Sequence, residues 1–549
     1  MIHGKAIRLA ALVTVLGLVA AACGGDGGDG GTGGDGKSGG TFVFGASADP
    51  VSLDGAFVSD GESIRVIYQV FEGLVRTEDG GFKPVPALAT EWEPSSDGKT
   101  WTFTLREGVK FHDGTDFNAE AVCFNFNRWY NFKGLLQAES LTYYWKNVFG
   151  AFSDKPAESL FKSCTAKDPK TVVIELTRAS ASFLNALVLA NFSIASPAAL
   201  QKYEADKVGG TAESPTLEGS YGLEHPTGTG PFKFVSFAAK DRLVLERNDD
   251  YWGEKAKFDR VIFRAIPDAA ARRTALETGE IQAFDNPSPD DIASLKNNFA
   301  IEERPPFNVG YIGFNQKIKP FDNLKIRQAI AHAINKDALL KAKYPEGAQA
   351  AIQFQPPDLF GWNGDVPKYE YDVNKAKQLI AESGLPQPVT LEFWYPTDVS
   401  RGYMPDPSAN FQAFKSDLEA AGFRVTPKSA PWRPDYLNAA QSGQAGMYLL
   451  GWLADFGDPD NFVGVFFQQP SDQFGFDNKA IFDKLTEAEV ETDEGKRTDL
   501  YKEANKMIME LVPGVPYVHT ATFVAMAKKV QGFVPSPINL ERFSIMSFA

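Results

Sequence analysis

The amino-acid sequence predicts an α/β fold built on parallel strands. The clearest sign is the region 389–453, where three apolar segments of strand length are separated by two segments with helical spacing. That strand–helix–strand–helix–strand order builds a parallel sheet with right-handed crossovers. The chain of 549 residues is also long enough for about three domains, and its apolar fraction of 43% is enough for sizeable cores.

The first 22 residues have the layout of a secretory signal. Two positive charges precede an apolar run from Leu9 to Ala22, about 14 residues long, whereas a membrane-spanning helix needs about 20. The small residues before Cys23 are similar to a bacterial lipoprotein cleavage box, except that Ala20 stands where the box usually has Leu. We expect Cys23 to become the lipidated first residue of an exported protein. An ordinary signal peptide with an incidental cysteine is the alternative.

Residues 24–40 are almost entirely Gly, Asp, Ser and Thr, so they have little to bury. A flexible coil of this length spans on the order of 20–25 Å. We interpret the segment as a tether between the lipid anchor and the folded protein, and we expect that anchor to be the protein's link to the membrane.

Cys123 and Cys164 are the other two cysteines, and none of the three lies in a CxxC pair. The common zinc-ribbon and thioredoxin patterns are therefore missing. Because an exported protein folds in an oxidising compartment, where disulfides persist, we expect Cys123 and Cys164 to pair. Two buried free thiols are the alternative.

Local patterns predict further elements along the first half of the chain. A hairpin is indicated at 92–105, where Asp97-Gly98 marks the turn and apolar residues alternate with threonines. Asn118 precedes a helical segment and is predicted to be its N-cap. An apolar helix is expected over 178–200, followed by a Gly- and Pro-rich loop or subdomain boundary over 209–230. The remaining predicted elements are strands at 41–45, 232–237, 242–247 and 261–266 and helices at 63–74 and 268–278.

Two helices of the second half have recognisable starts. One begins near Asn323, after a short apolar segment at 309–314, and the other is expected to begin at Asn410 and to end at Gly422. The helix that begins near Asn323 carries apolar residues at the spacing of one helical face. These residues are Ile326, Ala329, Ile330, Ala333 and Ile334. We expect this face to pack in the core and not to form a functional site.

Composition and motifs argue against several functions. Acidic residues outnumber basic ones by 70 to 55, so we do not expect a nucleic-acid partner. The sequence lacks the HExxH pattern, and outside the low-complexity segment 24–40 it also lacks the GxSxG, Walker and GxGxxG patterns. The glycines within 228–231 favour a tight turn over a phosphate cradle. Asp455, Asp458 and Asp460 only partly resemble a calcium loop, because the EF-hand glycine and distal Glu are missing. We therefore expect no metal and no cofactor.

Two charged residues follow the carboxyl ends of neighbouring predicted strands. Arg401 lies in the loop after the strand at 389–395, and Asp455 comes directly after the strand at 447–453; ligands of parallel sheets bind beyond such strand ends. An acceptor for an ammonium group and a two-pronged donor for a carboxylate together suit a zwitterion. Solvated loop charges and core aromatics explain the same pattern and remain the alternative. Candidate apolar walls are Tyr403, Trp452 and Phe456.

Four blocks, in order along the chain, carry a family resemblance. They are 92–115 (WEPSSDGKTWTFTLREGVKFHDGT), 228–232 (GTGPF), 319–330 (KPFDNLKIRQAI) and 451–462 (GWLADFGDPDNF). With them, the chain from about Gly40 to its end resembles the extracellular solute-binding proteins of family 5, the peptide- and dipeptide-binding lipoproteins that serve ABC importers. Ala121 departs from the family pattern, which usually has Asp there, and this puts only the local helix cap in doubt.

The resemblance implies a two-lobed fold of the periplasmic-binding-protein type (type II, in the large cluster with an extra inserted subdomain), with a hinge of two crossing segments. The first lobe is expected at 41–308 and 518–549, with the insert at about 76–225, and the second lobe at 309–517. In peptide-binding members, the acidic residue at the position of Asp455 holds the peptide amino group. In dipeptide binders, an arginine in a loop similar to that of Arg401 holds the carboxylate.

The implied function is that of a monomeric extracytoplasmic receptor, lipid-anchored to a bacterial cell membrane, that delivers short, dipeptide-like peptides to the permease subunits of an ABC transporter. Other family members take oligopeptides, oligosaccharides, nickel complexes or other solutes on the same scaffold. An oligosaccharide receptor with Trp394, Trp432 and Trp452 as stacking platforms is therefore one alternative. A secreted hydrolase that uses a carboxylate pair is another, although we expect the protein not to be an enzyme.

Overall fold

The computed structural model describes residues 38–211 and 214–549. The predicted signal segment, the lipidation site Cys23 and the tether up to residue 37 lie outside these residues. The described residues fall within one compact unit. Among them, no helix is both long and apolar enough to cross a membrane.

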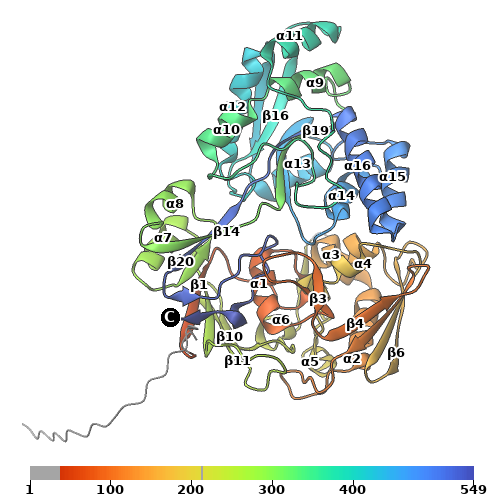
Figure 1. Cartoon of the computed structure of the whole chain (residues 1–549), viewed down its shortest axis with the longest axis vertical. Helices are drawn as coiled ribbons and strands as arrows, with labels where there is room; N and C mark the ends of the chain where they lie inside the picture. The colour runs from red at the N-terminus through yellow and green to blue at the C-terminus, as the bar shows by residue number, and fades with distance from the viewer. Residues whose placement is uncertain (1–37, 212–213) are drawn as a thin grey trace, which may run out of the picture. The chain divides into compact units, whose positions relative to one another are not determined.

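A mixed seven-stranded sheet forms the centre of the first lobe (Figure 1). Its strand order is β10-β11-β12-β1-β13-β20-β14, and β1 lies parallel to β12 and β13 while the other neighbours are antiparallel. Helices α7 and α8 lie beside β13 and β14. The strands are β1 (Thr41–Ala46), β10 (Phe232–Ala238), β11 (Arg242–Arg247), β12 (Arg260–Ala265), β13 (Ala283–Asp285), β14 (Phe299–Arg304) and β20 (Thr522–Ala527). The helices of this part are α1 (Gly61–Val70), α5 (Pro197–Lys202), α6 (Tyr221–Glu224), α7 (Ala269–Glu277) and α8 (Pro289–Leu295).

An antiparallel four-stranded sheet belongs to a second part of the first lobe. Its order is β4-β5-β7-β6, and β4 and β5 form the hairpin predicted at 92–105. Asn118 caps α2 as predicted, since its side chain accepts the Ala121 N–H at 2.9 Å. The elements are β4 (Ala89–Pro94), β5 (Thr100–Leu105), α2 (Ala119–Tyr130), α3 (Glu139–Phe149), β6 (Phe161–Asp168), β7 (Thr171–Leu176) and α4 (Phe183–Ala186).

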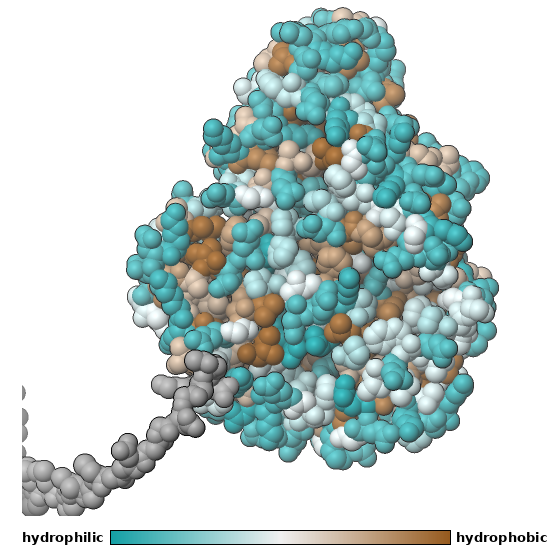
Figure 2. All heavy atoms as spheres, viewed as in Figure 1, coloured by the Kyte–Doolittle hydropathy of each residue, from teal (hydrophilic) through white to brown (hydrophobic). Residues whose placement is uncertain are grey.

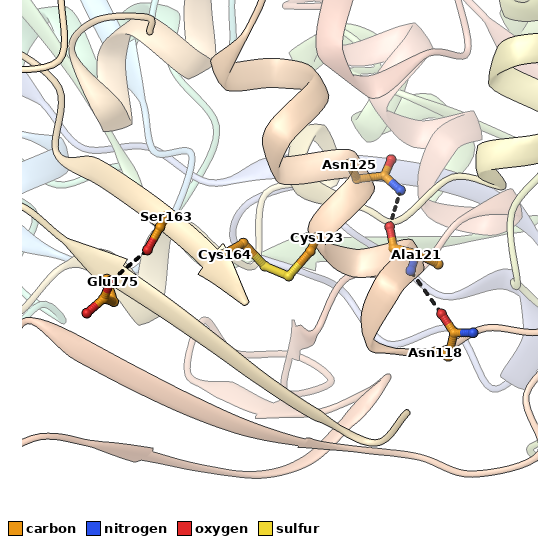
Figure 3. The surroundings of a disulfide bond; sticks show 7 residues. All are labelled: Asn118, Ala121, Cys123, Asn125, Ser163, Cys164 and Glu175. Atoms are coloured by element: carbon orange, nitrogen blue, oxygen red, sulfur yellow. Dashed lines mark hydrogen bonds between the residues drawn. A yellow bond between two sulfur atoms is a disulfide. The ribbon is translucent and has the colours of Figure 1, made fainter. Parts of the chain in front are cut away.

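A disulfide fastens α2 to this sheet (Figure 3). It joins Cys123 of the helix to Cys164 of β6, the two cysteines paired in the sequence analysis. The two residues are 41 positions apart, so the bond closes a loop that contains α3. A crosslink over a loop of this length restricts the unfolded chain considerably.

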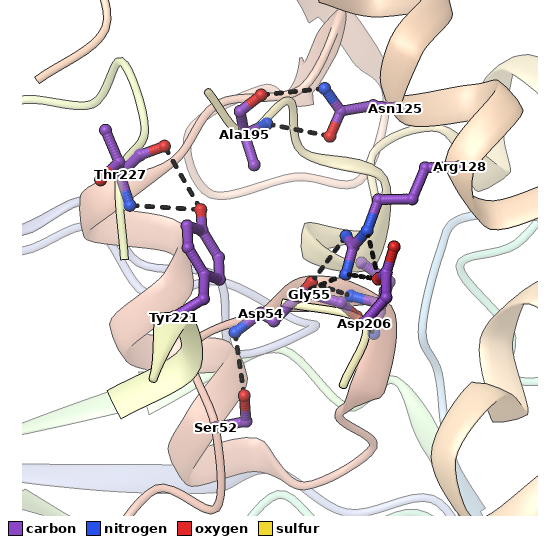
Figure 4. A network of polar contacts seen from close by, with 11 residues as sticks. Ser52, Asp54, Gly55, Asn125, Arg128, Ala195, Asp206, Tyr221 and Thr227 are labelled. Atoms are coloured by element: carbon purple, nitrogen blue, oxygen red, sulfur yellow. Dashed lines mark hydrogen bonds and ion pairs between the residues drawn. The ribbon is translucent and has the colours of Figure 1, made fainter. Parts of the chain in front are cut away.

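Buried charges attach α2 to the rest of the first lobe (Figure 4). Arg128 of α2 donates through Nη2 to Asp54 Oδ2 at 2.6 Å and through Nε to Asp206 Oδ1 at 2.7 Å. The side chains of Arg128 and Asp54 are only 4% and 5% exposed. One turn earlier on the helix, Asn125 exchanges two hydrogen bonds with the backbone of Ala195. The position of α2 therefore depends on a desolvated ion pair whose partners must both be present.

A five-stranded sheet in the order β17-β16-β18-β15-β19 forms the centre of the second lobe. β16 lies between β17 and β18 and is parallel to both, which confirms the parallel sheet predicted at 389–453. The strands are β15 (Asn308–Phe314), β16 (Thr390–Pro396), β17 (Arg424–Ala430), β18 (Met447–Leu453) and β19 (Gly514–Val518). The helices are α9 (Leu324–Ala333), α10 (Lys336–Lys343), α11 (Val373–Glu382), α12 (Pro407–Ala420), α13 (Leu437–Gln441), α14 (Val463–Phe467), α15 (Lys479–Val490) and α16 (Glu494–Leu511).

Apolar side chains from the predicted patterns lie in the cores. Asn323 caps α9, and the apolar stripe of that helix is buried, as predicted. On the face seen in Figure 2, hydrophilic side chains predominate and hydrophobic ones occur in small groups. Pairs of short strands complete the fold: β2 (Val75–Thr77) with β3 (Pro84–Pro86), β8 (Val208–Gly210) with β9 (Pro215–Leu217), and β21 (Val530–Gln531) with β22 (Ser547–Phe548).

The chain passes between the two large sheets where β14 leads into β15 and again where β19 leads into β20. These two crossings are bonded to each other. Asn308 Nδ2 donates to the Thr520 carbonyl at 2.8 Å, and the Thr520 N–H donates to Asn308 Oδ1 at 3.2 Å. The ring nitrogen Nδ1 of His519 lies 2.6 Å from the Asn308 carbonyl. The two lobes are therefore joined through a pair of short segments that hold each other in place.

The helix predicted over 178–200 is wrong. The chain forms α4, a 3₁₀ turn at Ala190–Phe192 and then α5. Proline cannot continue a helix but fits its first turn, so Pro197 begins α5 instead of extending an earlier helix.

The predicted start of the helix at Asn410 is also wrong. The side chain of Asp406 accepts the Ala409 N–H at 2.9 Å, so α12 begins at Pro407. Asn410 is instead buried inside the helix, where its amide donates to the Tyr344 hydroxyl at 2.7 Å. A residue type common at N-caps is used here for a buried hydrogen bond.

We predict that Asp54→Ala lowers the free energy of unfolding by about 3 kcal/mol, because the buried guanidinium of Arg128 loses its buried partner. Asp483→Ala is the matched control, since it removes an exposed pair with Lys479 that contributes under about 1 kcal/mol. Denaturant unfolding measures both. Equal losses in the two variants would contradict the role given to the buried pair.

Candidate functional site

The two charged residues singled out in the sequence follow neighbouring parallel strands. Phe393 of β16 is in register with Met447 of β18, and both strands run in the same direction. Their carboxyl ends therefore lie at one edge of the sheet. Arg401 follows β16 at that edge, and Asp455 follows β18.

The loops that carry these two residues both contact the first lobe. The Tyr144 hydroxyl of α3 donates to Asp455 Oδ1 at 2.7 Å. A Cβ atom placed on Gly402, next to Arg401, would lie 2.5 Å from Thr522 Cγ2 of β20. Both loops thus lie at the junction of the lobes. Among the contacts of the described residues, no hydrogen bond or ion pair joins Arg401 to Asp455 directly.

Asn461 holds Asp455 from within the second lobe. Its side-chain oxygen accepts the Asp455 N–H at 2.8 Å, and its amide nitrogen lies 3.4 Å from Asp455 Oδ2. The same oxygen lies 3.4 Å from Nε1 of Trp452, whose ring packs edge-on against Phe466. Asn461 is itself buried. The strand end and the following loop are therefore fixed around the carboxylate by one buried amide.

Burial raises the pKa of Asp455 to about 6, and the hydrogen bonds from Tyr144 and Asn461 offset only part of this effect. Burial and the nearby carboxylate also raise the pKa of Tyr144 well above its ordinary value, so its hydroxyl stays a donor at neutral pH. Both donors to Asp455 are neutral. In the part of the chain that the structure describes, no cationic side chain pairs with this carboxylate.

Tyr144 was not predicted as a site residue. It lies 311 positions from Asp455 along the chain. The aromatic run 143–145 was the available signal, but such runs are usually core, and Trp145 is indeed buried in the core beside α2.

Arg401 is exposed, and its guanidinium carbon lies 5.1 Å from the centroid of the Trp432 ring. Two backbone hydrogen bonds with Met404, of 3.1 and 2.9 Å, close a tight turn around it. The backbone N–H of Trp432 donates to Asp398 Oδ1 at 2.6 Å, which ties the tryptophan to the same loop. The turn and the aromatic face position Arg401, and none of the described acidic residues forms an ion pair with it.

The three predicted aromatic walls have different surroundings. Tyr403 is 7% exposed and packs its ring over Gly451, so that strand position has no room for a side chain. Phe456 is 5% exposed and belongs to the core of the four-stranded sheet in the first lobe. Trp452 is half-buried next to Asn461. Tyr403 and Phe456 are therefore core residues that support the site, and Trp452 is the most accessible of the three.

The acidic residues after Asp455 form a buried cluster. The two Nη groups of Arg497 donate hydrogen bonds to the two carboxylate oxygens of Asp458 at 2.7 and 2.8 Å. Asn185 of the first lobe donates to Asp458 Oδ2 at 2.9 Å. Asp460 Oδ2 lies 3.4 Å from the Ser182 hydroxyl, while its buried Oδ1 has no partner among the described residues. Asp458 is thus a structural residue that links the lobes. Among the described residues, no group of three or more candidate ligands is arranged to hold a metal ion.

Burial, together with the charges of Asp458 and Glu489, raises the pKa of Asp460 to about 7, although Arg497 opposes the shift. The folded state therefore binds the Asp460 proton more tightly than the unfolded chain does, and stability falls as the pH rises from about 4 to about 7.

We predict that Asp460→Asn reduces the pH-dependent decrease in the free energy of unfolding by about 2–4 kcal/mol, because asparagine does not ionise. Unfolding by urea at pH 4.5, 6 and 7.5 measures it. Asp472→Asn makes the same substitution at an exposed position and is the control. We expect its stability to depend on pH as in the wild type. A pH profile for Asp460→Asn that overlays the wild type would show that Asp460 is already ionised at low pH.

Comparison with known proteins identifies the family of the chain. Residues 83–474 match the bacterial extracellular solute-binding proteins, family 5, in the middle region of that family. The chain belongs to this family. Its fold is the two-lobed α/β fold of periplasmic binding proteins, as predicted.

Individual relatives cover nearly the whole chain. The dipeptide-binding protein of Escherichia coli (strain K12) is 34% identical over 87% of this chain and 89% of its own length. Heme-binding protein A of Haemophilus influenzae is 31% identical over 98% of this chain and 97% of its own. An ABC transporter-associated periplasmic binding protein from Helicobacter pylori, solved in complex with the peptide STSA, has a TM-score of 0.77 and 30% identity, covering 93% of this chain and 98% of that one.

Proposed function

We propose that this protein is an extracytoplasmic receptor that binds short peptides of the dipeptide class between its lobes and delivers them to an ABC importer. One observation carries the proposal: the half-buried carboxylate of Asp455 lies at the lobe junction, and among the described residues it has neutral hydrogen-bond donors only. A carboxylate shielded from much of the water is costly without a positive partner. The α-ammonium group of a peptide supplies that partner. The names of the E. coli and H. pylori relatives support the same ligand class.

Arg401 is the proposed partner of the peptide carboxylate. Its guanidinium lies over the Trp432 ring, and its planar fork can serve as a two-pronged donor to a carboxylate. With the ammonium group at Asp455 and the carboxylate at Arg401, both ends of a short peptide are recognised by charge. Side-chain identity then contributes less to affinity, which suits a receptor for many sequences.

The lobes are proposed to close over the peptide about the two crossing segments. In this interpretation the first lobe is 41–308 with 518–549 and the second lobe is 309–517. The Tyr144–Asp455 contact and the Asn185–Asp458 contact join the lobes in the closed form. A ligand that touches both sides favours this form, because it binds the closed state better than the open one.

The location of the protein is part of the proposal. Export, lipidation at Cys23 and a tether of residues 24–40 place a monomeric receptor at the outer side of the cytoplasmic membrane, next to its permease. These features rest on the sequence pattern alone. No catalytic role is assigned to the protein.

We predict that Asp455→Asn weakens the binding of alanyl-alanine by about 2–5 kcal/mol, because the ligand ammonium loses its counter-charge. In the wild type, affinity falls up to tenfold per pH unit below about pH 6, where Asp455 takes up a proton. The variant lacks this pH dependence. Titration calorimetry from pH 5 to 8 measures both effects.

N-Acetyl-alanyl-alanine is the matched ligand control, since it lacks the ammonium group. If the wild type and Asp455→Asn show the same ratio of affinities for the free and the acetylated peptide, Asp455 does not bind the amino terminus. Cellobiose and haemin are the comparison ligands for the alternatives. Tight binding of either of them, with no binding of peptide, would replace the proposed ligand class.

Arg401→Gln is predicted to weaken alanyl-alanine roughly 10- to 100-fold, the usual effect of losing hydrogen bonds to a charged group. It leaves the affinity for alanyl-alaninamide nearly unchanged, because the amide has no negative charge to lose. Calorimetry with the two ligands gives the loss of affinity that the substitution causes for each of them. A drop of the same size for both ligands would mean that Arg401 acts only through the structure of its loop.

A further inference from the structure

The first lobe contains a cavity of about 270 Å³ that is lined by residues of that lobe. It lies beside the end of α1, and Arg76, Arg106 and Arg542 reach its wall from three different segments. Asp455 and Arg401 do not line it. The cavity is therefore separate from the peptide site proposed above.

Glu72 is fixed at one side of the cavity by three neutral donors. Thr229 Oγ1 and Tyr251 Oη each donate at 2.8 Å, and Trp252 Nε1 donates at 2.9 Å. Thr229 belongs to the Gly-Thr-Gly-Pro segment that the sequence analysis assigned to a turn. The adjacent Gly228 and Gly230 lie against the Val70 backbone, where a side chain does not fit. Pro231 of this segment lines the cavity, and Thr229 holds Glu72 behind the wall. Three of the roughly four acceptor positions of the Glu72 carboxylate are used.

Arg106 lies over the ring of Trp252. Its guanidinium carbon is 4.0 Å from the ring centroid, and its Nε donates to the Ala87 carbonyl at 3.2 Å. Because Trp252 is itself held by Glu72, the position of the Arg106 guanidinium depends on both of these side chains. Among the contacts of the described residues, Arg106 has no ion pair, and its two Nη groups have no hydrogen-bond acceptor.

The other two arginines add positive charge to the same wall. Arg76 and Arg542 share one carboxylate, Asp79, at 3.4 and 3.0 Å. Glu254 is the other acidic residue that lines the cavity besides Glu72, and it is exposed. The remaining lining is mostly apolar, with Phe71, Val75 and Pro231 among it. Among the described residues, the guanidinium of Arg106 therefore has no direct ion pair, although its charge acts on Glu72 from a distance, and it lies beside an apolar cavity body.

We propose that this cavity is a second ligand site, specific for a small aromatic carboxylate. The carboxylate binds the two Nη groups of Arg106 in the bidentate geometry that guanidinium favours. The ring occupies the apolar part of the cavity. A cavity of roughly 150 Å³ already holds benzene, so 270 Å³ accommodates an acid of the size of benzoate or phenylacetate.

Calorimetry with phenylacetate as the probe tests the site in the full-length protein. The wild type is expected to bind phenylacetate at least tenfold more tightly than 2-phenylethanol, which has the same ring but no charge. Arg106→Gln removes this preference and leaves alanyl-alanine affinity unchanged. Arg401→Gln is the matched control, because it makes the same substitution at the peptide site and keeps the preference for phenylacetate.

Two results would overturn the proposal. One is a wild type that shows no preference for the carboxylate over the alcohol. The other is loss of phenylacetate binding in Arg401→Gln with retention in Arg106→Gln, which would place the acid in the peptide site. Arg106→Lys covers the case in which the Gln variant does not fold. It keeps the charge but not the planar fork, so it is expected to lose at least part of the preference, and full retention counts against the proposal.

Discussion

A carboxylate without a positive partner, held at the junction of two lobes, is the constraint on which the account of this protein depends. Asp455 is fixed by Asn461 from the second lobe and by Tyr144 from the first, and the groups that these two residues donate to its carboxylate are neutral. Such a group is stabilised most by a cation that arrives from outside. Because one donor comes from each lobe, the relative position of the lobes and the charge state of Asp455 are physically coupled.

Neighbouring residues keep that junction in place without serving the ligand. Asp458 is neutralised by Arg497 and is joined to the first lobe through Asn185. Phe456 packs in the core of the four-stranded sheet, and Tyr403 packs over Gly451. In the loop after β18, Asp455 is therefore available to a ligand, while the residues that follow it anchor the loop. The acidic residues that closely follow the Gly-Trp pair of β18 thus have different roles.

Local patterns were enough to predict the parallel sheet and the placement of Arg401 and Asp455 at its edge, because alternation and strand order act over short distances. The hairpin at 92–105 and the cap at Asn118 followed for the same reason. Tyr144 was out of reach, since only the folded chain brings it to Asp455. The wrong helix start at Asn410 has a related cause: a buried hydrogen bond to Tyr344, formed across the fold, outweighs the residue's preference for a cap.

The most direct test of the central claim is a carboxyl-carbon NMR titration of Asp455, identified by difference from Asp455→Asn, with and without alanyl-alanine. The account predicts an apparent pKa near 6 in the free protein, raised by burial, and a value lower by at least one unit in the peptide complex. N-Acetyl-alanyl-alanine should not produce this decrease. An unchanged pKa for Asp455 in the presence of saturating free peptide would contradict the account.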